Sequence, residues 1–252
     1  MSLAPAVVTL LTDFGTADGY VGEMKGVLAS LAPGAPLVDI THEVPAHDVE
    51  SGRLALARSW RRFPPGTVHL AVVDPGVGSA RRALAVQSDG RLLVGPDNGL
   101  LSPALLVAGA RVVQLPIPPT ASATFHGRDV FAPAAAALAT GAPIEDLGHP
   151  VEDPIVKRTP EAHRRLDGSI EGQVIAVDRF GNAITNLVGR LGGVLEVDGA
   201  RLPVRRSYSE VDEDAPAVIV GSTGLLEVSV RDGSGAERFG LHRGSRVVLH
   251  PR

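Results

Sequence analysis

The stretch TVHLAVVDPGVGSARRA (residues 67–83) begins as an apolar run, reaches an aspartate, turns through two glycines and ends in paired arginines. A short continuous apolar run bounded by turn residues is typical of a strand that is buried on both faces. Such strands belong to parallel sheets that are covered by helices on both sides. The stretch therefore predicts a central strand that brings Asp74 to the carboxyl edge of an α/β sheet.

The first 150 residues repeat this pattern of strands and helices. The segments AVVTLLTDF (6–14) and PLVDI (36–40) are strand-like, whereas GYVGEMKGVLASLA (19–32) and DVESGRLALARSWRRF (48–63) are helix-like. Asp48 is a predicted N-cap because its carboxylate can accept a free amide of the first helical turn. We expect a Rossmann-like α/β domain with a mainly parallel sheet.

Local signals complete the prediction for this part of the chain. RALAVQSDGRLLVG (82–95) predicts a hairpin, because Asp89-Gly90 suits a type I′ turn. Two further helices are expected in LLSPALLVAGA (100–110) and DVFAPAAAALATG (129–141), the second of which ends at Gly141.

The pattern changes at about residue 168. From there to the C-terminus the chain consists of short strand-like segments separated by Gly, Asp and Asn turns, with no helical stretch. Several closely spaced strands of this kind are typical of a small barrel. We predict an α/β domain over 1–150, a Pro-rich charged linker over 151–167 and an all-β barrel domain over 168–252.

Composition limits the possible partners of this 252-residue chain. A formal net charge of −4 gives no reason to expect a nucleic-acid partner. The absence of cysteine excludes disulfides, thiolate nucleophiles and cysteine-ligated zinc. No segment approaches the ~20 apolar residues of a membrane span and no signal peptide is evident, so we expect no membrane partner and a cytoplasmic location.

Four polar residues are expected near one edge of the α/β sheet. Ligands of such sheets bind beyond the carboxyl ends of the strands, where Asp13 and Asp74 are predicted to lie. Asp13 either accepts the hydroxyls of a ribose or caps a turn. Arg81 is placed to pair with Asp74, and the pair either holds a water molecule or braces the loop. His126 precedes a glycine and the start of a helix, so its ring is expected at the same edge.

Other polar stretches have simpler interpretations. THEVPAH (41–47) resembles the zinc-binding pattern H-E-x-x-H, but it has one residue too many and Pro45 breaks the required helix, so we predict no metal site. Turn chemistry alone would explain Asp178, Asn182 and Ser222.

Taken together, however, seven stretches resemble one family, the S-adenosyl-L-methionine (SAM) hydroxide adenosyltransferases. These SAM hydrolases are related to the SAM-dependent fluorinase and chlorinase. The matching stretches are, in order, TDFG, DITHEVPAHDV, VVDPGVGSARR, GPDNGL, TFHGRDVFAP, DRFGNAITN and GSTGLLEV. No one of them suffices, but their order and spacing over nearly the whole chain are specific.

The resemblance implies a fold, an assembly and a set of site residues. It implies a Rossmann-like domain joined to a β-barrel, a homotrimer, and SAM bound between one subunit's first domain and its neighbour's second. The implied catalytic residues are Asp74, Arg81 and His126. Of the implied substrate-binding residues, Asp13 holds the ribose, Asp178 the methionine ammonium and Ser222 the methionine carboxylate. Asn182 and Tyr208 are implied to meet adenine, and His47 the pocket edge.

The implied reaction is attack of water or hydroxide on the ribose 5′-carbon, which yields adenosine and L-methionine. Either His126 or Asp74 takes the proton, and no metal or cofactor is needed beside the substrate SAM. In the fluorinase a tyrosine, another aromatic residue and a serine stand where this chain has Asp74, His126 and Gly127, so the hydroxide-using pattern is favoured. The alternatives are a halogenase-like adenosyltransferase and a non-catalytic SAM or adenosine sensor.

Overall fold

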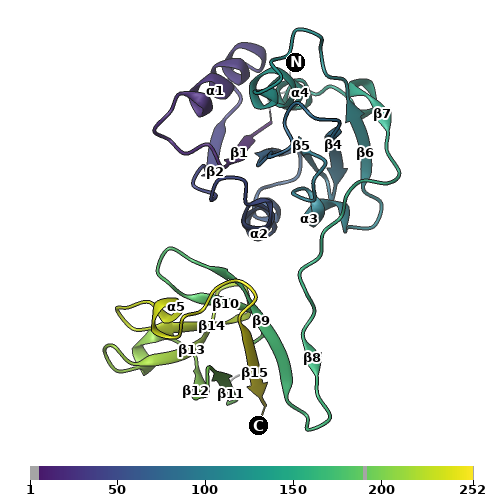
Figure 1. The fold of residues 1–252 in the computed structure, drawn as a ribbon. Coiled ribbons are helices and arrows are strands. Elements are labelled where there is room, and N and C mark those ends of the chain that lie inside the picture. Colours follow the sequence, from purple (N-terminus) through teal and green to yellow (C-terminus); the bar gives the residue numbers. More distant parts are fainter. Residues whose placement is uncertain (1–5, 190–191, 252) are drawn as a thin grey trace. The chain divides into compact units, whose positions relative to one another are not determined.

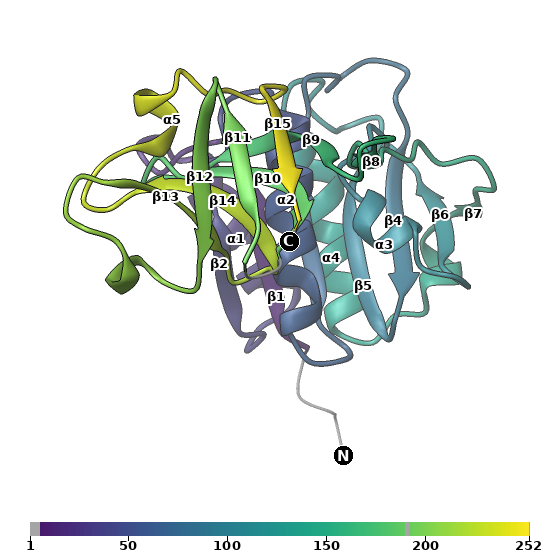
Figure 2. The same ribbon diagram turned by 90° about the horizontal axis from the view of Figure 1, so that it is seen from below.

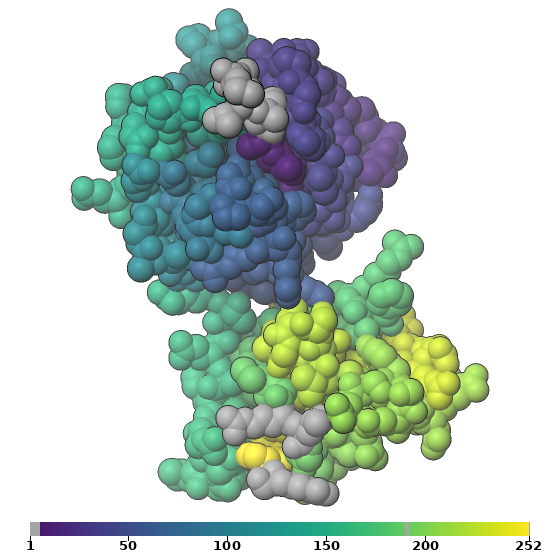
Figure 3. All heavy atoms as spheres, turned by 180° about the vertical axis from the view of Figure 1, so that it is seen from behind, coloured from purple at the N-terminus to yellow at the C-terminus, as the bar shows by residue number. Residues whose placement is uncertain are grey.

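The computed structural model describes residues 6–189 and 192–251, which form two compact units that divide between Arg158 and Thr159. In Figure 3 the purple-to-teal residues form the first unit and the green-to-yellow residues form the second. The division falls inside the segment 151–167 that the sequence suggests as a linker. Each unit has its own hydrophobic core.

The N-terminal unit is built on a seven-stranded sheet (Figure 1). The spatial order of its strands is β2 (Leu37–Thr41), β1 (Val8–Thr12), β3 (Val68–Val72), β5 (Arg91–Pro96), β4 (Ala83–Ser88), β6 (Arg111–Leu115) and β7 (His149–Pro150). The first four are parallel, while β4 is antiparallel to β5 and β6, and β7 to β6. The Rossmann-like prediction is confirmed, with a mixed sheet because a hairpin and an edge strand add antiparallel pairs.

Helices cover both faces of this sheet, as the apolar run of β3 predicts. Helices α1 (Tyr20–Leu31) and α4 (Ala132–Ala139) lie on one face, whereas α2 (Val49–Ser59) and the short α3 (Ser102–Leu105) lie on the other. Viewed from below, α2 lies in front of the strands and α4 behind them (Figure 2). The side chains of β3 and Val73 alternate between the two cores, so the strand that ends at Asp74 is buried on both sides.

Shorter helical turns complete this unit. They are η1 (Trp60–Arg62), the π-helical turn η2 (Gly127–Phe131) directly before α4, and η3 (Ile144–Leu147).

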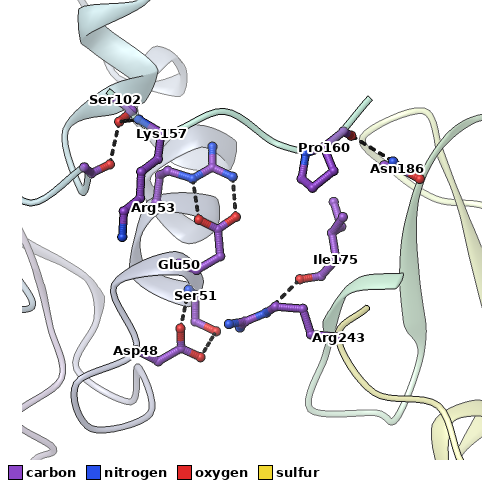
Figure 4. Close-up of polar contacts among 11 residues, drawn as sticks. Asp48, Glu50, Ser51, Arg53, Ser102, Lys157, Pro160, Ile175, Asn186 and Arg243 are labelled. Carbon is purple, nitrogen blue, oxygen red and sulfur yellow. Dashed lines mark hydrogen bonds and ion pairs between the residues drawn. The ribbon is translucent and has the colours of Figure 1, made fainter. Parts of the chain in front are cut away.

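Local sequence signals determine several element ends. Asp48 caps α2 by accepting hydrogen bonds from the Ser51 amide (3.0 Å) and hydroxyl (2.8 Å), as Figure 4 shows. Asp89 and Gly90 have φ values of 49° and 70°, which fits the predicted type I′ hairpin. Gly141, with φ of 96°, follows the end of α4 and donates to Leu138 O at 3.0 Å. These three predictions are confirmed.

The C-terminal unit is a closed barrel. Its strands follow the order β10 (Ala183–Val188), β14 (Leu225–Val230), β13 (Pro216–Val220), β12 (Ala200–Arg205), β11 (Val194–Val197), β15 (Arg246–His250) and β9 (Ile170–Val177). Pairing of β9 with β10 closes the ring, and β8 (His163–Arg164) extends it beside β9.

The barrel prediction is confirmed, but the expectation of no helix is wrong in two places. Ser234 caps a single turn, α5 (Gly235–Arg238), by accepting the amide of Glu237 at 3.1 Å. The other exception is the single 3₁₀ turn η4 (Tyr208–Glu210) between β12 and β13. Among the described residues, no helix combines the length and the apolar character needed to cross a bilayer.

His69 makes the stability of the N-terminal unit depend on pH. It lies on β3, fully buried, with Nδ1 2.7 Å from the Thr9 hydroxyl and its ring against Phe63 and Trp60. Burial, helped by the positive charge of Arg91, lowers the pKa of His69 to about 4. The unfolded chain takes up this proton below its usual pKa of about 6.5, whereas the folded chain resists it. Stability is therefore lost as the pH falls from about 6.5 towards 4.

We expect His69→Gln to remove this part of the acid sensitivity. Between pH 7 and 4.5, the wild type should lose about 2.5 kcal/mol more unfolding free energy than the variant. Urea unfolding at the two pH values measures the difference. His149→Gln, at an exposed histidine, is the control and should keep the wild-type pH dependence. Equal losses in wild type and His69→Gln would contradict the assignment.

Candidate active site

Asp74 lies just beyond the end of β3, at the start of a tight turn. The Val77 amide donates to Asp74 O at 3.2 Å, and the Ser79 amide donates to Gly76 O at 3.1 Å. Gly78 has a φ of 76°, and a Cβ there would lie 2.4 Å from the Ala123 carbonyl oxygen. Only glycine allows the turn to pack this closely against the segment that leads to His126.

Arg81 folds back from the end of this turn onto Asp74. Its Nε lies 3.0 Å from each oxygen of the carboxylate, and its Nη2 also donates to Oδ2. The two side chains are only 9% and 5% exposed, and the guanidinium stacks on the Phe131 ring at 5.1 Å. Among the described residues, buried Nη1 has no hydrogen-bond partner. A buried donor left in this way is available to a bound water molecule or ligand.

His126 completes the group. Its Nδ1 lies 2.9 Å from Arg81 Nη2, and because a guanidinium only donates, Nδ1 must accept. Burial first, and then the charge of Arg81, lower the pKa of His126, while Asp74 and Asp129 oppose this effect. The ring is therefore neutral at pH 7, with its proton on Nε2. The structure brings the three predicted catalytic residues into one hydrogen-bonded chain.

Asp13 and His47 lie together at the end of the neighbouring strand. Asp13 follows β1, whose Thr12 pairs with Val72 of β3, so Asp13 and Asp74 occupy adjacent strand ends. Asp13 Oδ2 accepts the backbone amide of His47 at 2.8 Å. His47 has a φ of 66°, a conformation that is uncommon outside glycine, so this bond fixes the loop that carries its ring.

An aromatic cluster that the sequence reasoning missed joins the loops after β1 and before η2. Phe14, Tyr20 and Phe125 pack edge to face, with ring centroids 5.3 to 6.0 Å apart. Phe14 directly follows Asp13, and Phe125 directly precedes His126. The signal in the sequence was an aromatic residue next to Asp13 and another next to His126, but the contact between these rings depends on the fold. The cluster fixes the two loops relative to each other.

In the C-terminal unit, Asp178 and Asn182 share one turn. Asp178 Oδ1 accepts the amides of Phe180 and Asn182, both at 2.9 Å, and Oδ2 accepts Asn182 Nδ2 at 2.9 Å. Turn chemistry thus engages both oxygens of Asp178, as the simpler interpretation of the sequence holds. Tyr208 in η4 and Ser222 between β13 and β14 lie on two other loops and are exposed.

The chemistry of the Asp74–Arg81–His126 chain is that of a small polar site. It contains a carboxylate, an always-charged donor and a neutral imidazole, and none of the three residues carries a hydroxyl or thiol nucleophile. In residues 6–189 and 192–251, no group of three or more His, Asp or Glu side chains could hold a metal ion. The arrangement is suited to orienting water and lowering the cost of its deprotonation.

Comparison with known proteins identifies both units. Residues 8–148 match the family model of the SAM hydroxide adenosyltransferase N-terminal domain. Residues 172–248 match that of the C-terminal domain of the same family.

Relatives cover nearly the whole chain. A Thermus thermophilus protein named (R)-S-adenosyl-L-methionine hydrolase is 48% identical over 96% of this chain and 98% of its own. A fluorinase from Actinopolyspora mzabensis is 28% identical over 98% and 97%. The crystal structure of an uncharacterized conserved protein from Thermotoga maritima, 31% identical, superposes with a TM-score of 0.89 over 98% of this chain and 100% of that chain.

The contact between Arg81 and His126 has a measurable consequence. We expect Arg81→Gln to raise the pKa of His126, because the variant removes a cation that opposes protonation and leaves Asp74 unpaired. Proton NMR titration of the imidazoles measures the shift, and His126→Asn assigns the resonance. Arg61→Gln, which alters an exposed arginine, should leave it unchanged. An unaltered pKa in Arg81→Gln would mean that the contact is not made in solution.

Proposed function

We propose that this chain, which belongs to the SAM hydroxide adenosyltransferase family, hydrolyses SAM to adenosine and L-methionine. The observation that supports this best is the buried chain of Asp74, Arg81 and His126, because it offers oriented donors and acceptors for one water molecule. Hydrolase names among its relatives point the same way. A halogenase-like reaction and a sensor without turnover are not favoured by these features.

The names of three relatives support a proposal about the stereochemistry of the substrate. They specify an (R) compound whose methionine part is already designated L. The ribose centres are those of adenosine, so the prefix describes the sulfonium sulfur, which is a stereocentre. We extend this preference for the (R) sulfonium epimer to the present chain.

In the proposed mechanism Arg81 holds the nucleophile. Its unpartnered Nη1 donates to the water oxygen and stabilises developing hydroxide. Asp74 receives the proton, because a carboxylate can accept more bonds than its contacts with Arg81 use, whereas His126 Nδ1 already accepts from Arg81. His126 keeps Nε2–H as a further donor.

The bond changes require no acid and no metal. A water oxygen bonds to C5′ as the C5′–S bond breaks, and the electron pair of that bond stays on sulfur, which leaves as the neutral thioether of methionine. Positive charge on sulfur is cancelled as the new bond forms, so a site from which bulk water is excluded favours the transition state. Holding water in line with C5′ supplies a large share of the rate, on the order of 7 kcal/mol in favourable cases.

The binding roles remain those implied by the family. Asp13 holds the ribose hydroxyls, Asp178 the methionine ammonium and Ser222 the methionine carboxylate. Asn182 and Tyr208 meet the adenine, and His47 borders the pocket. These residues divide between the two units, and we propose a homotrimer in which each site joins the first unit of one subunit to the second unit of its neighbour. The cytoplasmic location stays a prediction from the sequence.

Incubation of the protein with each sulfonium epimer of SAM in ¹⁸O-labelled water tests the reaction. We expect adenosine that carries the label at its 5′-oxygen, faster turnover of the (R) epimer, and full activity in excess EDTA. Asp74→Asn should lower kcat about 100-fold, because the proton acceptor is lost. Liquid chromatography with mass spectrometry measures the products. Intact SAM, unlabelled adenosine or loss of activity in EDTA would contradict the proposal.

The assembly is tested by mixing two inactive variants, Asp74→Ala and Asp178→Ala. If each site is shared between two subunits, co-refolding at a 1:1 ratio should restore activity in about one quarter of the sites. Those sites combine the intact first unit of one variant with the intact second unit of the other. SAM cleavage before and after co-refolding measures the recovery, and light scattering gives the mass of the assembly. No recovery, or an active monomer, would disprove the shared site.

A further inference from the structure

The turn 97–100, which follows β5 inside the stretch GPDNGL, contains two polar side chains that the mechanism does not use. Asp97 is 3% exposed and Asn98 is half-buried. Burying a carboxylate and an amide has a cost unless each is hydrogen-bonded, so their partners indicate why they are there.

Asn98 is bonded to the residue that precedes Asp74. Its Nδ2 donates to the carbonyl of Val73 at 2.8 Å, and its Oδ1 accepts the amide of Leu100 at 3.1 Å. Val73 is fully buried and lies one residue beyond the end of β3. The Asn98 side chain therefore fixes the backbone of Val73, one residue beyond the end of β3 and directly before Asp74.

Asp97 is bonded to the residue that follows Arg81. Its amide donates to the Arg82 carbonyl at 3.0 Å, and its Oδ2 accepts Arg82 Nε at 2.7 Å. The Asp97 side chain is 2% exposed, so the carboxylate of this ion pair is shielded from solvent. Both ends of the loop from Asp74 to Arg81 are thus attached to one turn.

The same turn also holds the segment that leads to the second unit. Asp97 Oδ1 accepts the amide of Ile155 at 2.7 Å, and Arg82 donates to Asp153 Oδ1 at 2.6 Å. Further along, the amide of Lys157 donates to the Ser102 hydroxyl at 2.8 Å (Figure 4). Both carboxylate oxygens of Asp97 are therefore hydrogen-bonded. Oδ2 binds Arg82 at the end of the catalytic loop, and Oδ1 binds Ile155 in the segment that leads to the second unit.

We propose that Asn98 and Asp97 are positioning residues for the hydrolysis: Asn98 sets the place of Asp74, and Asp97, through Arg82, sets the place of Arg81. The proposal rests on the function given above. An Asp–Arg pair can form in several geometries, but water must be held in line with the 5′-carbon. A displacement of about 1 Å at such a site can lower the rate by about 100-fold.

The test compares Asn98→Ala with Asn186→Ala. In the C-terminal unit, Asn186 makes the same kinds of bond. It donates to Pro160 O (Figure 4) and accepts the amide of Gln173, both at 2.8 Å. We expect Asn98→Ala to lower kcat between about 10- and 100-fold while KM changes less than about threefold. Asn186→Ala should keep the kcat of the wild type.

A second pair of variants covers the case in which Asn98→Ala does not fold. Asp97→Asn keeps the size of the side chain and weakens its bond to Arg82, so it should lower kcat in the same way. Asp153→Asn changes the other carboxylate that binds Arg82. The Asp153 side chain is 85% exposed, so this variant should leave kcat unchanged. Thermal unfolding of each variant establishes the folded fraction.

A readout without SAM separates this proposal from the proposed function. If the turn positions the pair, Asn98→Ala and Asp97→Asn disturb the contact between Arg81 and His126, and the imidazole NMR titration moves towards the ordinary pKa. That shift supports the positioning role even if the wild type cleaves no SAM. Folded variants with wild-type kcat and an unchanged His126 titration would overturn the proposal, as would a fall in kcat that equals the loss of folded protein.

Discussion

Asp74 and Arg81 form an ion pair at the end of a buried strand. The rest of the site depends on how the hydrogen-bonding groups of this pair find their partners. Asp74 and Arg81 are both largely out of water, where an unpaired charge costs several kcal/mol. The turn between them must therefore close tightly, which requires glycine at position 78. The remaining donor, Arg81 Nη1, is left over by this geometry, and it is the group best placed to hold a nucleophile.

The neutral state of His126 is a second consequence of the same pair. Arg81 already donates to its Nδ1, so the ring adds no charge beside the guanidinium. The site then has one negative group, one positive group and one neutral donor, an arrangement that can receive a proton from water and still tolerate the sulfonium of the substrate. In the proposed mechanism the rate depends mainly on the placement of the water molecule. This is why residues one step away from Asp74 and Arg81 matter.

Placement is achieved by contacts that come from several parts of the N-terminal unit. The aromatic cluster joins the Asp13 loop to the His126 loop, and the Asn98 side chain joins β5 to the end of β3. Asp97 also connects the turn after β5 to Ile155, and Arg82 connects the end of the catalytic loop to Asp153. The sheet supplies the common edge, but these cross-links determine where each functional atom lies. They also make the site sensitive to substitutions that touch neither water nor substrate.

The sequence by itself determined the features that depend on neighbouring residues. The apolar run of residues 68–73 identified a strand buried on both faces, and Asp48, Asp89-Gly90 and Gly141 marked element ends, because caps and turns are decided within a few residues. The family resemblance added the site residues. Only the tertiary structure decided that His126 accepts from Arg81 and that Asn98 bonds Val73, since these partners are 45 and 25 residues apart. Such contacts follow from how strands and loops pack, and a single sequence has no local signal for them.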